Sequence, residues 1–171
     1  MAKLIGVALI LGGVLGVLYS WICTQKDTQI RREETILFLQ KMMFSMQNEK
    51  MPILVFLERY ESKDIILQRS IKELVKKLKS NSYPKGQEAW QEVLKEEESN
   101  WNWDKESFGL LIRAGEGFFG RTCEENLCFL QKVIEELEIE RKKSKEADKN
   151  ERKVWIPVSM LGGIMLTILF L

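Results

Sequence analysis

The residues of this chain with the greatest chemical potential are three cysteines, one run of glutamates and one glycine-rich hexapeptide. Cys123 is expected near a helix N-terminus, where the pKa of a thiol falls and the reactive thiolate is favoured. The chain contains no histidine, so this thiol lacks the commonest general base. Cys123 and Cys128 are separated by about 140° around a helix, so they do not converge on one metal ion. We predict no catalytic residue, no metal site and no bound cofactor.

The glutamate run and the hexapeptide are also poor candidates for catalysis. Glu96, Glu97 and Glu98 are consecutive, so on a helix their carboxylates point in different directions and form a solvated face. Residues 115–120 read GEGFFG, the spacing of a dinucleotide-binding fingerprint, but that fingerprint needs a preceding strand in a βαβ unit. A helix is expected before this segment. We therefore predict a turn between two helices at Gly115, Gly117 and Gly120, and we predict that the protein is not an enzyme.

Composition excludes two further classes of function. The chain has 26 basic and 25 acidic residues, and this balance gives no indication of a nucleic-acid-binding surface. Its three cysteines are an odd number, which argues against the disulfide framework of a small secreted protein.

The charged residues lie almost entirely between two uncharged apolar stretches, at 4–25 and 154–171. About twenty apolar residues are enough for a helix to cross the roughly 30 Å hydrocarbon core of a bilayer. We predict an N-terminal transmembrane anchor over 1–25, a cytoplasmic helical domain over 26–153 and a C-terminal transmembrane helix over 154–171. A cleaved signal peptide is the alternative for the first stretch, but the stretch is long and lacks a small-x-small cleavage site.

Basic residues flank both apolar stretches on the side of the central domain. They are Lys26, Arg31, Arg32, Arg141, Lys142, Lys143, Lys145, Lys149, Arg152 and Lys153. Only Lys3 lies on the other side, so the positive-inside rule places the domain in the cytoplasm and both chain ends across the membrane. The last six of these residues, named here the basic stalk, are expected to attract anionic lipid headgroups at about 1 kcal/mol each. A solvated stalk without a ligand is the alternative.

A ridge of small residues marks the first apolar stretch. Ala8, Gly12 and Gly16 are spaced four apart, which lets a second helix approach closely. Glycine is also common in membrane helices without such a role. Whether the protein forms a homo-oligomer through this ridge is therefore left open.

The middle of the chain has helical periodicity throughout, which predicts an all-α helical bundle. Helices are expected over about 28–47, from Pro52, from about Lys63, around residues 89–94, and from an N-cap at Asp104. Thr122 and Glu125 have the spacing of a capping box that begins the last helix. If that helix extends to Lys153, it is roughly 45 Å long. The tryptophans at 90, 101 and 103 are interpreted as residues of the core or of an interface, with stacking on a ligand as the alternative.

This layout resembles the stage III sporulation protein AB family of endospore-forming bacteria. The likeness is most specific from Phe108 to the C-terminus. The features in this part are Phe119-Gly120 at the corner, Gln131 on the last helix, the pair Leu137-Glu138, and Gly162-Gly163 in the final stretch. Two further features lie earlier in the chain: the opening Lys3-Leu4-Ile5-Gly6, and Pro52 after the first long helix. The segment before Pro52 lacks the expected glycine turn, and the region of the tryptophans does not match.

The resemblance implies a non-enzymatic membrane platform in a channel, similar to a secretion apparatus, between mother cell and forespore. The family is similar to the cytoplasmic domains of type II secretion F proteins, on which an assembly ATPase acts. The implied partners are the sporulation ATPase and the other channel proteins, and the implied location is the mother-cell membrane around the forespore. The alternative is a membrane-tethered adaptor or signalling protein whose basic stalk binds lipid.

Overall fold

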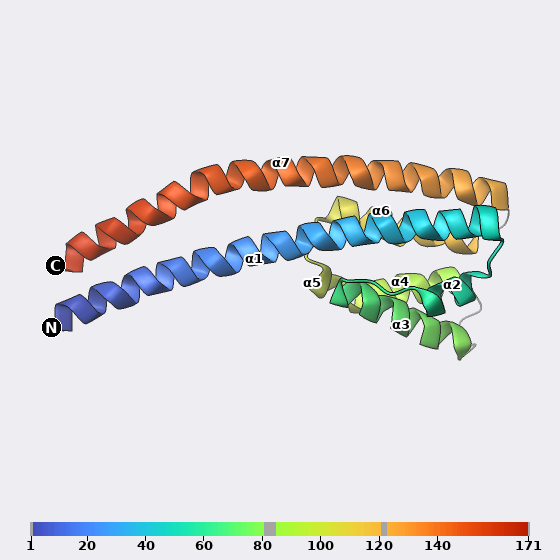
Figure 1. Cartoon of the computed structure of the whole chain (residues 1–171), viewed down its shortest axis with the longest axis horizontal. Helices are drawn as coiled ribbons and strands as arrows, with labels where there is room; N and C mark the ends of the chain where they lie inside the picture. The colour runs from blue at the N-terminus through green and yellow to red at the C-terminus, as the bar shows by residue number, and fades with distance from the viewer. Residues whose placement is uncertain (1, 81–84, 121–122, 171) are drawn as a thin grey trace. The chain divides into compact units, whose positions relative to one another are not determined.

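The computed structural model describes residues 2–80, 85–120 and 123–170, and among these it describes the side chains except at 2–11, 14, 123, 124, 166, 167, 169 and 170. Every element in the described ranges is a helix, which confirms the all-α prediction. The elements in chain order are α1 (Ala2–Phe44), a π-helix (Ser45–Glu49), α2 (Ile53–Arg59), α3 (Ile65–Lys79), α4 (Gly86–Glu96), α5 (Glu98–Trp101), α6 (Lys105–Phe119) and α7 (Cys123–Phe170) (Figure 1).

The chain divides into two compact units. The central unit comprises residues 28–141, and the terminal unit comprises residues 1–27 together with 142–171. Helices α1 and α7 contribute to both units. This division places the basic stalk in the terminal unit, whereas the sequence grouped it with the central domain. The predicted domain boundaries at 25 and 153 stay predictions.

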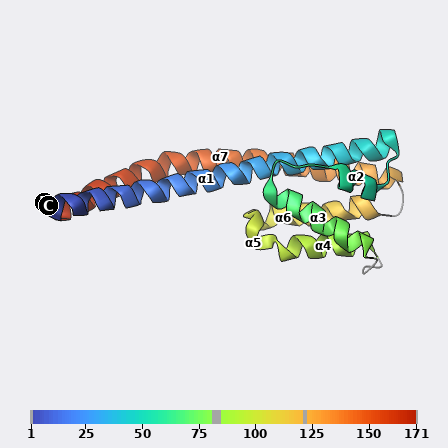
Figure 2. The same ribbon diagram turned by 60° about the horizontal axis from the view of Figure 1, so that its bottom comes forward.

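The core of the central unit is built around an aromatic cluster. The Phe38 ring lies 5.0 Å from the ring of Tyr60 and 6.4 Å from that of Trp90, and Phe118 lies 5.3 Å from Trp90. Helix α4 packs against both α3 and α6 (Figure 2), and its residue Trp90 belongs to this aromatic cluster. Burial of each such side chain contributes about 1.5–3 kcal/mol. The predicted core role of the tryptophans is confirmed at Trp90 and Trp101, which are fully buried, while Trp103 is half-buried.

Two aspartates begin the helices that follow them. Asp64 accepts a hydrogen bond from the backbone N–H of Leu67 at 2.8 Å and caps α3. Asp104 accepts one from the N–H of Ser107 at 2.8 Å and caps α6. Each side chain satisfies one of the backbone donors left free in the first helical turn. The predicted cap at Asp104 is confirmed.

The two long helices run without a break through the ends of the central unit. Residues 17–44 contain no proline or glycine, so no helix-breaking residue interrupts α1 between the first apolar stretch and Phe44. Helix α7 continues through Lys153 and past Pro157 to Phe170. Pro157 removes one N–H donor from α7 and its ring crowds the carbonyl oxygen four residues earlier, which kinks a helix, but α7 continues past it. The sequence had left open how far the last helix extends, and in the structure α7 contains the whole charged segment up to Lys153.

The turn predicted over Gly115, Gly117 and Gly120 is wrong for the first two glycines, which lie inside α6. A Cβ at Gly115 would collide with the Trp90 indole, and one at Gly117 would collide with the Leu130 side chain. These glycines therefore serve close packing within the core. Gly120 is the residue at which α6 ends. Thr122 of the predicted capping box lies outside the described residues.

Candidate functional site

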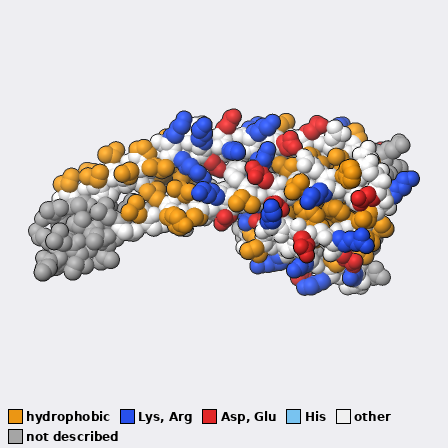
Figure 3. Space-filling view, viewed as in Figure 1, with side chains coloured by type: hydrophobic (Ala, Val, Ile, Leu, Met, Phe, Trp, Pro, Cys, Tyr) orange, Lys and Arg blue, Asp and Glu red, His pale blue; other side chains and the backbone are white. Residues whose placement is uncertain are grey.

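The terminal unit exposes an unusual amount of apolar surface. In Figure 3 hydrophobic side chains gather over this unit beyond the stalk. The exposed ones in the apolar stretches include Leu15, Val17, Tyr19, Val154, Trp155, Ile156, Val158, Met160, Leu161, Ile164, Met165 and Ile168, with exposed fractions from 37% to 76%. A contiguous apolar surface of this kind marks a place that a membrane or another protein covers.

The predicted transmembrane spans are not confirmed. Considering only the described part of the chain, no helix has both the length and the apolar character needed to cross a membrane. The side chain of Ala8, in the predicted helix-packing ridge, lies outside the described residues, while Gly12 and Gly16 are exposed. A Cβ added at either glycine would meet nothing within 4 Å. The ridge therefore stays a prediction.

The basic stalk presents most of its charge to solvent. Lys142, Lys143, Lys145, Lys149 and Lys153 are exposed on α7. Arg152 is half-buried, and its Nε donates to the Gln25 side-chain oxygen at 2.8 Å, which links the two chain segments of the terminal unit. Exposed ammonium groups beside an apolar surface are suited to anionic headgroups.

Two arginines that the sequence assigned to the membrane flank are buried in the central unit. The first, Arg31, donates through Nε to both carboxylate oxygens of Asp64 at 3.2 Å. Its Nη1 donates to the carbonyl oxygens of Asn100 and Trp101, at 3.2 and 2.7 Å. One guanidinium thus joins α1 to the start of α3 and to α5. A buried cation is tolerated only with such pairing.

The second arginine, Arg32, joins α1 to the start of α6. It donates through Nη1 to Ser107 Oγ and through Nη2 to Asp104 Oδ2, both at 2.8 Å, and its guanidinium lies 5.2 Å from the Trp103 ring centroid. Partial burial opposes ionisation of Asp104, but hydrogen bonds from Arg32 and Ser107 outweigh it and lower the Asp104 pKa to about 2. Asp104 therefore caps α6 and, through its contact with Arg32, also joins α1 to the start of α6.

A signal for these arginines was present in the sequence. Arg31 and Thr35 lie four apart on the stripe that continues to Leu39, and Arg32 lies four before Ile36. All five residues are buried. Helical periodicity therefore places both arginines on the core face, whereas counting charges near an apolar stretch does not.

The residues considered for catalysis do not form a site in the described part of the chain. Glu96 accepts from Lys77 at 2.9 Å, whereas Glu97 accepts from Asn100 at 2.7 Å and pairs with Arg69 at 3.5 Å, so the two carboxylates have different partners. Among the described residues, no group of three or more potential ligands could hold a metal ion. The side chain of Cys123 lies outside the described residues.

Comparison with known proteins identifies the family. The stage III sporulation protein AB family matches residues 3–171, which is nearly the whole chain. No curated protein and no solved structure gives a significant match. The match extends over the middle of the chain, where the resemblance had not been specific. The chain therefore belongs to the stage III sporulation protein AB family.

Proposed function

We propose that this sporulation protein is a non-enzymatic membrane platform in a channel, similar to a secretion apparatus, between mother cell and forespore. The observation that carries the proposal is the exposed apolar surface of the terminal unit, to which both terminal segments of the chain contribute (Figure 1). Such a surface needs a cover, and a bilayer covers both chain ends at once. Both predicted spans, 1–25 and 154–171, then anchor in the same membrane.

The charge distribution supports a cytoplasmic location for the central unit. Arg31 and Arg32 are engaged with carboxylates inside that unit, so they contribute less to the membrane flank than a count of charges suggests. The basic stalk remains, with five exposed lysines on α7. Only Lys3 precedes the first apolar stretch. This excess of positive charge on one side favours the same orientation.

The platform role rests on the rigidity of the central unit and on the family. Two long helices enter this unit, and buried arginine contacts tie α1 to three further elements. An element held in this way transmits force or position between a membrane anchor and a partner. The partner we propose is the sporulation ATPase, with the other channel proteins around it in the mother-cell membrane.

A second function is favoured by one observation, the exposure of the stalk lysines. In this alternative the protein is a membrane-tethered adaptor or signalling protein, and the stalk binds anionic lipid. Because both functions predict membrane attachment, attachment does not distinguish them, whereas a variant of the stalk does. Changing Lys142, Lys143, Lys145 and Lys149 to Gln abolishes function in the adaptor and leaves the platform largely active, provided that the reporter at Leu171 shows an unchanged orientation. Lys26, Arg141, Arg152 and Lys153 still provide positive charge on the side of the central unit.

Deletion of the gene in a spore former tests the proposed function. We expect sporulation to stop after engulfment, and full complementation by the intact chain but not by a chain lacking 154–171. A reporter fused to Leu171 is expected to be active only on the far side of the membrane. Normal spore yield after deletion would contradict the proposal, and a cytoplasm-active reporter would overturn the orientation.

A further inference from the structure

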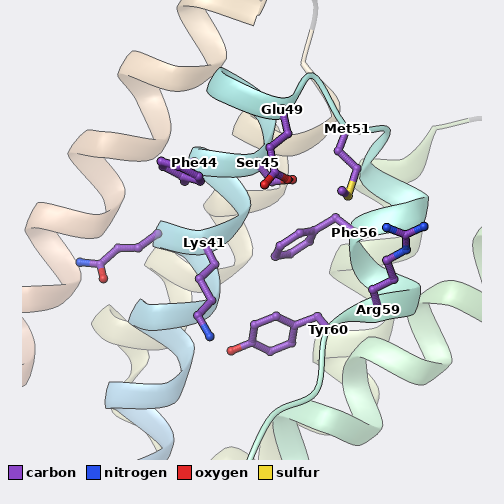
Figure 4. A pocket seen from close by; sticks show the side chains of 9 residues that line it. Lys41, Phe44, Ser45, Glu49, Met51, Phe56, Arg59 and Tyr60 are labelled. Carbon is purple, nitrogen blue, oxygen red and sulfur yellow. The ribbon is translucent and has the colours of Figure 1, made fainter.

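The central unit carries an open pocket where α1 passes into the π-helix and α2 follows (Figure 4). Its volume is about 520 Å³. The π-helix Ser45–Glu49 and the left-handed residue Lys50, with φ of 48°, reverse the chain between the two helices. π-helical turns occur frequently at functional sites. The pocket is therefore bounded by the end of α1 on one side and by α2 on the other.

The interior of the pocket is apolar and aromatic. Phe56 of α2 and Tyr60, the residue after α2, extend into the space between the helices (Figure 4), and their ring centroids lie 5.6 Å apart. Behind them the buried Phe38 lies 6.0 Å from Phe56, so this wall is continuous with the core. Phe44, which also lines the pocket, is 57% exposed. A bulky apolar side chain placed here would gain contact with a preformed wall.

The rim of the pocket has two cations with no carboxylate partner among the described residues. The Lys41 ammonium lies 5.6 Å from the Tyr60 ring centroid. Arg59, the last residue of α2 and the one before Tyr60, is exposed. The carboxylate on the rim, that of Glu49, already accepts a hydrogen bond from Ser45 Oγ at 2.9 Å. The rim therefore retains a positive excess that is complementary to an acidic ligand.

We propose that this pocket docks a segment of a partner protein in which a bulky apolar side chain lies one helical turn from an Asp or Glu. The apolar side chain packs on Phe56 and Tyr60, and the carboxylate meets Lys41 or Arg59, which lie on opposite sides of the two rings (Figure 4). Tyr and Arg are the residue types that dominate protein–protein binding energy. The inference rests on the proposed function in its expectation of a protein partner.

The test is site-specific photocrosslinking of the full chain in sporulating cells. A photoreactive residue replaces Phe44, and the crosslinked peptide is identified by mass spectrometry. We expect one protein whose crosslinked segment has an Asp or Glu within four residues of a bulky apolar residue. The double substitution Lys41→Glu/Arg59→Glu is expected to lower the yield at least about tenfold, because opposed like charges cost several kcal/mol.

A matched control is available on α3. Lys72 is exposed and outside this pocket, so Lys72→Glu is expected to leave the crosslinking yield unchanged. The neutral substitutions Lys41→Gln and Arg59→Gln keep the test valid if the charge-reversed chain does not fold. In the charge-reversed chain, changing the partner's carboxylate to Lys is expected to restore the crosslink.

Four results would each overturn the proposal for this pocket: no crosslink, a crosslink to lipid, a crosslink to a second copy of this chain, or a crosslinking yield that charge reversal does not change. The proposed function is judged separately. If deletion blocks sporulation and the chain is at the membrane while Phe44 crosslinks to no protein, the pocket proposal fails and the platform stands. If the chain is not at the membrane, the platform fails whatever the crosslink shows.

Discussion

Substitution of Asp64 by Asn tests whether the buried arginine contact holds α1 to the rest of the central unit. Arg31 and Asp64 each have side chains only 9% exposed. Asn is also a good N-cap, so the cap of α3 survives and the charge alone is lost. Loss of one partner of a buried pair costs about 3–5 kcal/mol. Because the two backbone carbonyls still accept from Arg31, we expect the lower end, about 3 kcal/mol.

The matched control is Asp104→Asn at the start of α6. This aspartate also caps a helix and pairs with an arginine, but its side chain is 50% exposed. Solvent screening therefore limits the cost to about 1 kcal/mol or less. Burial of the carboxylate is the main difference between the two substitutions, so the comparison isolates its effect.

Urea unfolding of the full chain in a mild detergent measures both effects. With Trp21 and Trp155 changed to Phe, the remaining tryptophans at 90, 101 and 103 all report on the central unit. At a slope of about 2 kcal/mol/M, we expect the midpoint to fall by about 1.5 M for Asp64→Asn and by no more than about 0.5 M for Asp104→Asn. Equal shifts, or a loss below about 1 kcal/mol at Asp64, would refute the reasoning.

Three further outcomes are expected. Gly115→Ala should lower the free energy of unfolding by about 1–3 kcal/mol, because the new Cβ collides with the Trp90 indole. Gly109→Ala in the same helix should raise it by up to about 1 kcal/mol, because a Cβ there meets open space. Equal urea midpoints for the two variants would contradict this. The pKa of Asp104 is lowered from 3.8 to about 2, so its contribution is complete above pH 4 and lost as the pH falls towards 2. Reduced for exposure, this is about 1 kcal/mol, and urea curves of the wild type and Asp104→Asn should converge near pH 2. Burial, with the nearby Glu34 carboxylate, raises the pKa of Tyr60 from 10 to about 12. The stability that it contributes is therefore present below pH 10 and lost as the pH rises towards 12, and absorbance at 295 nm should show a late titration step that Tyr60→Phe removes.

Local signals predicted much of the fold. The cap at Asp104 and the start of a helix after Pro52 depend on residues adjacent in the sequence, and both occur as expected. The continuity of α1 follows from the absence of Gly and Pro over 17–44. The short helix α5 and the π-helix at Ser45–Glu49 had no such signal, and the pocket beside the π-helix was therefore missed.

The errors arose where distant residues decide the outcome. Gly115 and Gly117 read locally as a turn, but contacts with Trp90 and Leu130 require small residues inside α6. Arg31 read locally as part of a membrane flank, but Asp64 and the carbonyl of Trp101 hold it in the core. Packing against another helix is not visible in sequence neighbours, so periodicity was the better guide at these positions.

The central claim is that a bilayer covers the apolar surface of the terminal unit. The most direct measurement is the accessibility of a nitroxide spin label at Leu161, which is 66% exposed, in full-length protein reconstituted into vesicles after Cys23, Cys123 and Cys128 are changed to Ser. The account predicts that oxygen, which concentrates in the bilayer, relaxes this label more than a water-soluble nickel chelate does, with the reverse order for a label at Lys72. A label at Leu161 as accessible to the nickel chelate as the label at Lys72 would contradict it.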